Sequence, residues 1–148
     1  MKRSGQLLAT AVLVLCTVGC DESLQDFAGP TPNLEPNFSS IQRDILSAAD
    51  TAGRPACTSC HNAQGAAFAG GLNLTGATAY NALVNAPSTG KAGAVRVIPG
   101  DPDGSYLIQK IEGAPGIVGD RMPRFGPFLT SGQIAIIRRW IELGAANN

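Results

Sequence analysis

Apolar residues recur at helical spacing in four stretches of the chain, and this pattern predicts four short helices. The first is expected to start at the capping box Ser39-Ser40-Ile41-Gln42 and to run to about residue 51, with Gly53 as its stop. The last starts with a second capping box at Thr130 and ends at Gly144. Its apolar face is wide, so we expect this helix to pack against more than one surface.

The two middle helices are expected to be shorter and to be joined to the others by long loops. One is predicted over 76–85, with Thr75 as its N-cap. The other is predicted to start with Asp101 as N-cap and Pro102 at the first helical position, and to end at Gly113. Proline suits the first helical position because its missing N–H has no partner there in any case.

Strand signals are weak, and the one candidate is a short extended piece at 95–98. The 148 residues include 18 glycines and 10 prolines, which predicts long ordered loops between short elements. The fold class is therefore expected to be all-α, with about four short helices and long Gly/Pro loops. Four short helices provide little contact with one another, so something else should fill the centre of the domain.

Composition and charge narrow the class of protein. Hydrophobic residues make up 44% of the chain, enough to build a core. Lys and Arg number 11, as do Asp and Glu, so the formal net charge is zero. The chain therefore lacks the basic excess of a nucleic-acid-binding protein, and we expect no nucleic-acid partner.

The N-terminal segment has the features of an export signal. A basic start, Met1-Lys2-Arg3, precedes an apolar stretch over 7–15 that is too short for a transmembrane helix. This stretch runs into Thr17-Val18-Gly19-Cys20, which resembles the end of a bacterial lipoprotein signal. Lipidation of Cys20 would anchor the exported chain to a membrane, facing the periplasm or the cell surface. The alternatives are an ordinary signal peptide or an uncleaved anchor, with Cys20 incidental.

The expected organisation has three parts. Residues 1–19 would be the lipoprotein signal peptide, and 20–37, which contain three prolines and no clear period, a flexible tether. Residues 38–148 would form the single folded domain.

The strongest chemical signal is Cys57-Thr58-Ser59-Cys60-His61, the C-x-x-C-H signature of covalent haem attachment. Two thiols at this spacing can add to the two vinyl groups of one porphyrin, and the following imidazole then reaches the iron as an axial ligand. A structural disulfide, a thioredoxin-like redox pair and a zinc site are the alternatives. The disulfide would close a very small loop, the redox pair lacks βαβ strands, and zinc lacks a fourth ligand.

The sixth iron ligand is expected to be Met122, the one methionine after the initiator. His61 is the only histidine, and His/Met is a known axial pair in cytochromes c. Met122 lies in a Pro-, Gly- and Arg-rich loop rather than on an apolar helical stripe, although a gap-filling core methionine is the alternative. Filling both axial positions leaves no open site for oxygen or peroxide, which favours electron transfer.

The domain resembles class I cytochromes c, and more closely the small cytochrome c domains of the planctomycete type, over about 38–148. The resemblance implies the cytochrome c fold around one covalent haem c, with the first and last helices crossing beside it. It also implies thioether bonds at Cys57 and Cys60, and His61 and Met122 as axial ligands. The matching stretches are Cys57–His61, Gly70–Leu74, Val97–Ser105, Met122-Pro123 and Ile134–Ala145.

The haem would complete the core, and several apolar side chains are expected around it. Arg121 and Arg124 are either partners of the haem propionates or solvated loop charges. The expected lining residues are Ile45, Leu72, Leu74, Tyr106, Leu107, Phe125, Phe128, Ile137 and Trp140.

The expected function is that of a monohaem c-type cytochrome, an electron carrier rather than an enzyme. Its partner would be a redox protein or a membrane electron-transfer complex. The alternatives are a haem-based gas or redox sensor, in which Met122 leaves the iron, and an electron-accepting subunit of a dehydrogenase complex.

Overall fold

The structure, a computed structural model, describes residues 34–65 and 69–148, and this part of the chain is all-α as expected. The expected signal peptide 1–19, the expected lipidation site Cys20 and most of the expected tether 20–37 lie outside the described residues. No helix in the described part is both long and apolar enough to cross a membrane.

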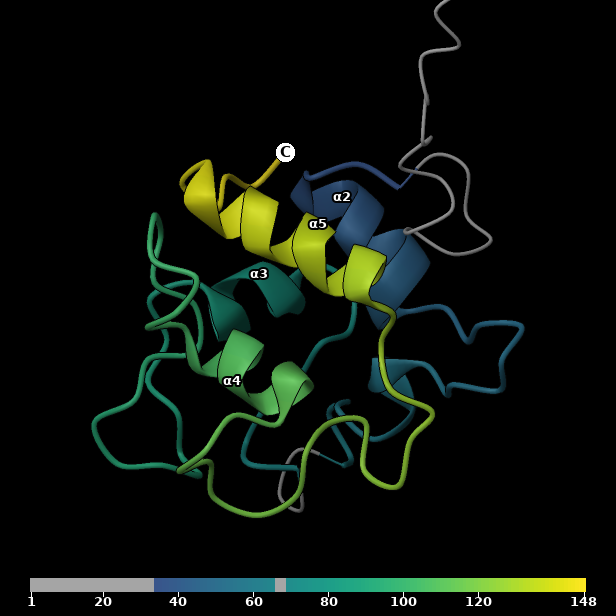
Figure 1. The fold of residues 1–148 in the computed structure, drawn as a ribbon, viewed down its shortest axis with the longest axis horizontal. Coiled ribbons are helices and arrows are strands. Elements are labelled where there is room, and N and C mark those ends of the chain that lie inside the picture. Colours follow the sequence, from purple (N-terminus) through teal and green to yellow (C-terminus); the bar gives the residue numbers. More distant parts are fainter. Residues whose placement is uncertain (1–33, 66–68) are drawn as a thin grey trace, which may run out of the picture.

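The described part of the chain contains four α-helices and two further helical turns, and loops join most of them (Figure 1). The elements are α2 (Phe38–Ile41), the π-helical turn η1 (Gln42–Leu46), the 3₁₀ turn η2 (Cys57–Ser59), α3 (Thr78–Leu83), α4 (Tyr106–Glu112) and α5 (Ser131–Glu142). No strand occurs in these residues. The expected extended piece at 95–98 instead makes isolated bridges, which are Val84–Val97, Pro87–Val95 and Ile98–Asp101.

The first helix starts earlier and ends earlier than the sequence predicts. Its N-cap is Asn37, whose side-chain oxygen accepts from the Ser40 amide at 2.8 Å, so the predicted capping box at Ser39 is wrong. The helix continues directly from α2 into η1 and ends at Leu46 rather than near residue 51. Beyond this end, the buried guanidinium of Arg54 donates to the Ile45 carbonyl, which another helical turn would have used.

The folded part also extends beyond its predicted start at residue 38. Leu34 packs partly buried against the core. The Glu35 amide donates to the Ser40 hydroxyl at 3.0 Å, and Asn37 caps α2. The last residues of the expected tether therefore belong to the folded part of the chain.

Both middle helices are shorter than predicted. Thr75 does not cap α3, because its hydroxyl donates to the Asn73 side chain at 2.7 Å. Helix α4 starts after Ser105, because the Asp101 carboxylate accepts from the Gly104 amide at 2.8 Å and closes a turn instead. The predicted end of this helix, Gly113, is confirmed, and it adopts the left-handed conformation with φ of 74°.

Helix α5 matches its prediction and packs on two neighbours. Thr130 and Gln133 form the full capping box, with the Gln133 amide donating to the Thr130 hydroxyl at 3.1 Å. The helix contacts both α2 and α4, so the prediction from its wide apolar face is confirmed. Figure 1 shows α5 lying across α2, and their contact includes the Phe38 and Trp140 rings, 5.5 Å apart.

Candidate cofactor site

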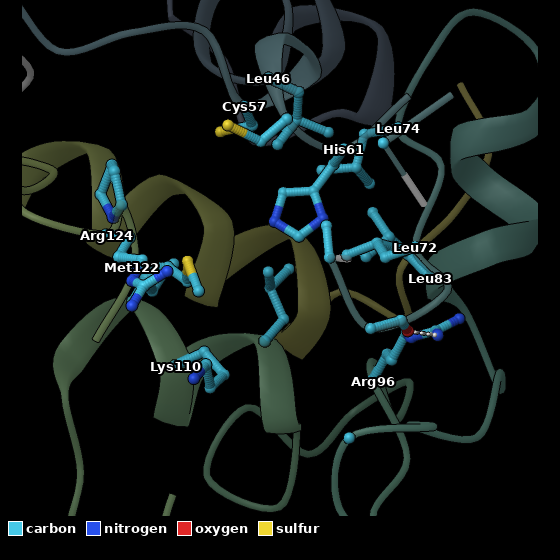
Figure 2. Close-up of a pocket in the computed structure, with 18 of the residues that line it drawn as sticks. Leu46, Cys57, His61, Leu72, Leu74, Leu83, Arg96, Lys110, Met122 and Arg124 are labelled. Atoms are coloured by element: carbon cyan, nitrogen blue, oxygen red, sulfur yellow. Dashed lines mark hydrogen bonds between the residues drawn. The ribbon is translucent and has the colours of Figure 1, made fainter. Parts of the chain in front are cut away.

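A large apolar cavity lies between the helices and the loops of the described chain (Figure 2). Its volume is about 880 Å³, inside the range of roughly 300–1,000 Å³ typical of small-molecule and cofactor sites. Most of its wall is aliphatic, from Ile45, Leu46, Leu72, Leu74, Leu83, Leu107, Ile111, Leu129 and Ile137. All four of the residues predicted to bind haem, Cys57, Cys60, His61 and Met122, also line it.

The C-x-x-C-H segment folds into a tight helical turn at the cavity wall. The Cys57 carbonyl accepts from the Cys60 amide at 3.2 Å and from the His61 amide at 2.9 Å. The second of these is an i to i+4 bond, and it places Cys57 and His61 on one side of the turn. The turn thus aims the first thiol and the imidazole at the same space.

Asn62, directly after the signature, fixes this turn through its side chain. Its amide nitrogen donates to the carbonyls of Thr58 at 3.0 Å and Ser59 at 3.2 Å. Its side-chain oxygen accepts from the Gly65 amide at 2.7 Å. Asn62 therefore closes the end of the turn, a role that its side-chain chemistry suits but that the sequence analysis did not assign.

The two cysteines are free thiols in different surroundings. Cys57 is half-buried, its Sγ lies 3.9 Å from the Ile45 carbonyl oxygen, and Cys60 is exposed. Burial raises the pKa of the Cys57 thiol, and the positive charge of Arg54 opposes that rise. The two cysteines form no disulfide in this structure, and burial favours the protonated form of the Cys57 thiol next to the cavity.

His61 is oriented as a ligand would be. Figure 2 shows its ring at the cavity, with one nitrogen turned toward the side of Met122. The other nitrogen, Nδ1, is buried and has no hydrogen-bond partner among the described residues. Burial lowers the pKa of His61, and the backbone of Leu72 and Ala69 opposes this, so the imidazole is favoured in the neutral form that binds metals.

Met122 reaches the cavity from a loop that follows α4. Its amide donates to the Lys110 carbonyl at 2.9 Å, which ties the loop to that helix. The neighbouring Arg121 donates from Nε to the Ile111 carbonyl at 2.8 Å, and its guanidinium stacks 4.0 Å from the centre of the Phe128 ring. Figure 2 shows the Met122 sulfur turned into the cavity, on the side that His61 faces.

The expected lining is only partly found. Trp140 is buried against Phe38 away from the cavity, while Phe125 is 89% exposed and Phe128 is 44% exposed. Outside the cavity, Phe125 stacks with Arg124 and Phe128 stacks with Arg121. The expected residues that do line the cavity are Ile45, Leu72, Leu74, Tyr106, Leu107 and Ile137.

The two arginines of the Met122 loop differ in their surroundings. Arg121 does not line the cavity, and the bond from its Nε to the Ile111 carbonyl fastens the loop to α4. Arg124 lies at the cavity rim and forms an exposed ion pair with Asp120, with Nε 2.8 Å from Oδ2.

Comparison with protein-family models, with curated proteins and with solved structures found no match. Within residues 34–65 and 69–148, no three His, Cys, Asp or Glu side chains are grouped closely enough to hold a metal ion. The interpretation of the cavity therefore rests on its own shape and side chains.

Proposed function

We propose that this chain is a monohaem c-type cytochrome with the cytochrome c fold, an electron carrier at the outer side of a bacterial membrane. The observation that supports it most is that the Cys57–His61 turn and Met122, far apart in the sequence, line one apolar cavity of cofactor size. Figure 2 shows the ring nitrogen of His61 other than Nδ1 turned toward the Met122 side of that cavity, as a ligand to iron held between these two residues would require. The contact between α2 and α5 agrees with the crossing of first and last helices in class I cytochromes c.

In this proposal Cys57 and Cys60 would hold haem c by thioether bonds, and the His61 imidazole and the Met122 thioether would bind its iron. When bound, the haem supplies a reversible one-electron couple at its iron. The chain's own residues surround the site mainly with apolar surface and hold both ligand-bearing segments through backbone hydrogen bonds of 2.9 Å. A thioether ligand favours the reduced iron, so it would raise the reduction potential.

The membrane attachment and the partner extend the proposal. Lipidation of Cys20 would place the domain at the periplasmic or outer surface, and the residues between would act as its tether. The electron partner would be a redox protein or a membrane electron-transfer complex.

Intact mass spectrometry of the exported protein, made with haem-attachment machinery, tests the proposal. We expect the mass of the chain plus one haem, and reduced and oxidised absorption spectra of a six-coordinate c-type haem. The control is a Cys57→Ala, Cys60→Ala double variant, whose exported protein should carry no covalent haem. An exported wild-type chain with no added prosthetic group would falsify the proposal.

The sensor and subunit alternatives predict different behaviour of the same sample. Rapid binding of CO by the untouched reduced protein would favour the sensor, because Met122 would then leave the iron easily. Co-purification with a flavin or quinone protein would favour the dehydrogenase subunit.

A further inference from the structure

Arg54 is a fully buried arginine just before the C-x-x-C-H turn, and the proposed function does not use it. Its side chain has no exposed surface, and it pairs with Asp50 with Nε 3.1 Å from Oδ2. Burying a charge is costly, and a buried ion pair is by itself weak evidence for stability. The contacts of this guanidinium therefore need another explanation.

The guanidinium holds together the two segments that flank the attachment turn. Its Nη1 donates to the carbonyls of Ile45 and Pro55, both at 3.2 Å. Its Nη2 donates to the Ala48 carbonyl at 3.2 Å. One planar group thus joins the end of η1, the loop after it and the residue two positions before Cys57.

The Ile45 carbonyl connects this contact to the thiol itself. It accepts from Arg54, and it also lies 3.9 Å from the Sγ of Cys57. That oxygen accepts from both groups at once, because a carbonyl has two lone pairs. Arg54 therefore fixes the position of the oxygen that holds the Cys57 thiol at the cavity wall. Without Arg54, the oxygen would lose this anchor and the thiol would lose its fixed place beside the cavity.

We propose that Arg54 is the positioning residue that presents the Cys57 thiol to the cavity for covalent attachment. This inference rests on the proposed function, because it concerns the bond between Cys57 and the haem. In the attachment step the Cys57 S–H adds across a vinyl C=C group. The sulfur bonds to one carbon and the hydrogen goes to the other, so the addition consumes no oxidant.

The test is to count thioether bonds in exported Arg54→Met. We expect most of its haem-bearing chains to hold the haem through Cys60 alone. The missing bond moves the α band of the alkaline pyridine haemochrome to longer wavelength, toward that of Cys57→Ala. Alkylation of the denatured protein followed by peptide mass mapping should find Cys57 as a free thiol and Cys60 modified.

Two controls separate positioning from a general loss of stability. Arg43→Met removes an arginine of η1 that is 64% exposed, and with it the ion pair that this arginine forms with Asp44. Ile108→Ala opens a hole in the core at a buried residue that does not line the cavity. Both variants should keep two thioether bonds, even if Ile108→Ala unfolds at a lower temperature than Arg54→Met.

Two thioether bonds in all Arg54→Met chains would overturn the inference, whatever their stability. If no Arg54→Met protein is exported, Arg54→Lys decides, because it keeps the charge but reaches fewer of the carbonyls. A mixture of singly and doubly attached chains is expected for it, and uniform double attachment would overturn the inference. A wild-type chain without haem is a separate result and refutes the proposed function itself.

Discussion

A substitution of Met122 can show whether this residue is an iron ligand or only a packing residue. Its side chain lines the cavity and packs partly buried against the core, so either role fits its position. A leucine at this position keeps most of the volume and apolar surface but has no sulfur to offer to iron. Exchanging the two usually costs less than about 1.5 kcal/mol when the role is only packing.

For Met122→Leu we therefore expect a small loss of stability and a large change in the properties of the haem. The weak far-red band of the ferric protein should vanish, the reduction potential should fall, and CO should bind rapidly to the reduced form. The measurements are absorption spectra, a redox titration and CO mixing on the wild type and the variant. An unchanged ferric spectrum in Met122→Leu would mean that the methionine is a packing residue.

Site residues could be predicted from the sequence where they lie close together along the chain. Cys57, Cys60 and His61 lie within five consecutive residues, so their spacing alone identified them as candidates, and all three line the cavity. Arg54 could not be predicted, because its partners are carbonyl groups whose positions depend on the path of the loop between η1 and η2. Backbone carbonyls are the same at every residue and leave no mark in the sequence.

At the scale of elements, the start of α2 offers a direct comparison of two possible caps. Asn37 accepts from the Ser40 amide, whereas the hydroxyl of Ser39 only donates to the Asn37 side chain at 3.0 Å. Asn37→Ala should therefore lower the free energy of unfolding by about 1 kcal/mol, the usual contribution of an N-cap. Ser39→Ala, the matched control, should stay within about 0.5 kcal/mol of the wild type.

Chemical unfolding of the holoprotein followed by circular dichroism measures both variants. Equal losses for Asn37→Ala and Ser39→Ala would show that neither side chain is the dominant cap, and a larger loss for Ser39→Ala would restore the box predicted from the sequence.

The helices differ in how well the sequence predicted them, and the reason is competition for the same groups. At α5 the capping box of Thr130 and Gln133 has no rival, and the predicted start is confirmed. At α4 the Asp101 carboxylate closes its own turn with the Gly104 amide, and the buried Ser105 hydroxyl donates to the Asp101 carbonyl at 2.7 Å. Local side-chain bonds of this kind compete with a helix start, and a sequence pattern cannot tell which will form.

At the scale of the whole molecule, two regions differ in how much their packing depends on the contents of the cavity. The ring of Phe38 in α2 packs on Tyr80 in α3 and on Trp140 in α5, and none of the three lines the cavity. The Tyr80 hydroxyl and the Trp140 ring nitrogen also donate to carbonyls after α5, at 2.9 and 2.8 Å. The loop after α4, by contrast, faces the cavity through Met122 and is tied to α4 by polar contacts, such as the bond from Arg121 to the Ile111 carbonyl.

Removal of the haem should therefore loosen the two regions unequally. In Cys57→Ala, Cys60→Ala protein without haem, we expect the Met122 amide, bonded to Lys110, to lose most of its protection from hydrogen exchange. The Ala145 amide, bonded to the Trp140 carbonyl at 2.9 Å, should keep more of its protection from hydrogen exchange. Amide-resolved exchange on the haem-bearing wild type and on this variant makes the comparison.

The expected order follows from what each region has left to pack against once the cavity is empty. An unfilled cavity of about 880 Å³ deprives its walls of contacts, and the cost falls on the segments that pack their apolar side chains against its contents. The contacts of Phe38 with Tyr80 and Trp140 lie outside the cavity and do not depend on what fills it. Equal loss at both amides would mean that the domain opens as one cooperative unit, and no loss at either would mean that the cavity needs no occupant to remain folded.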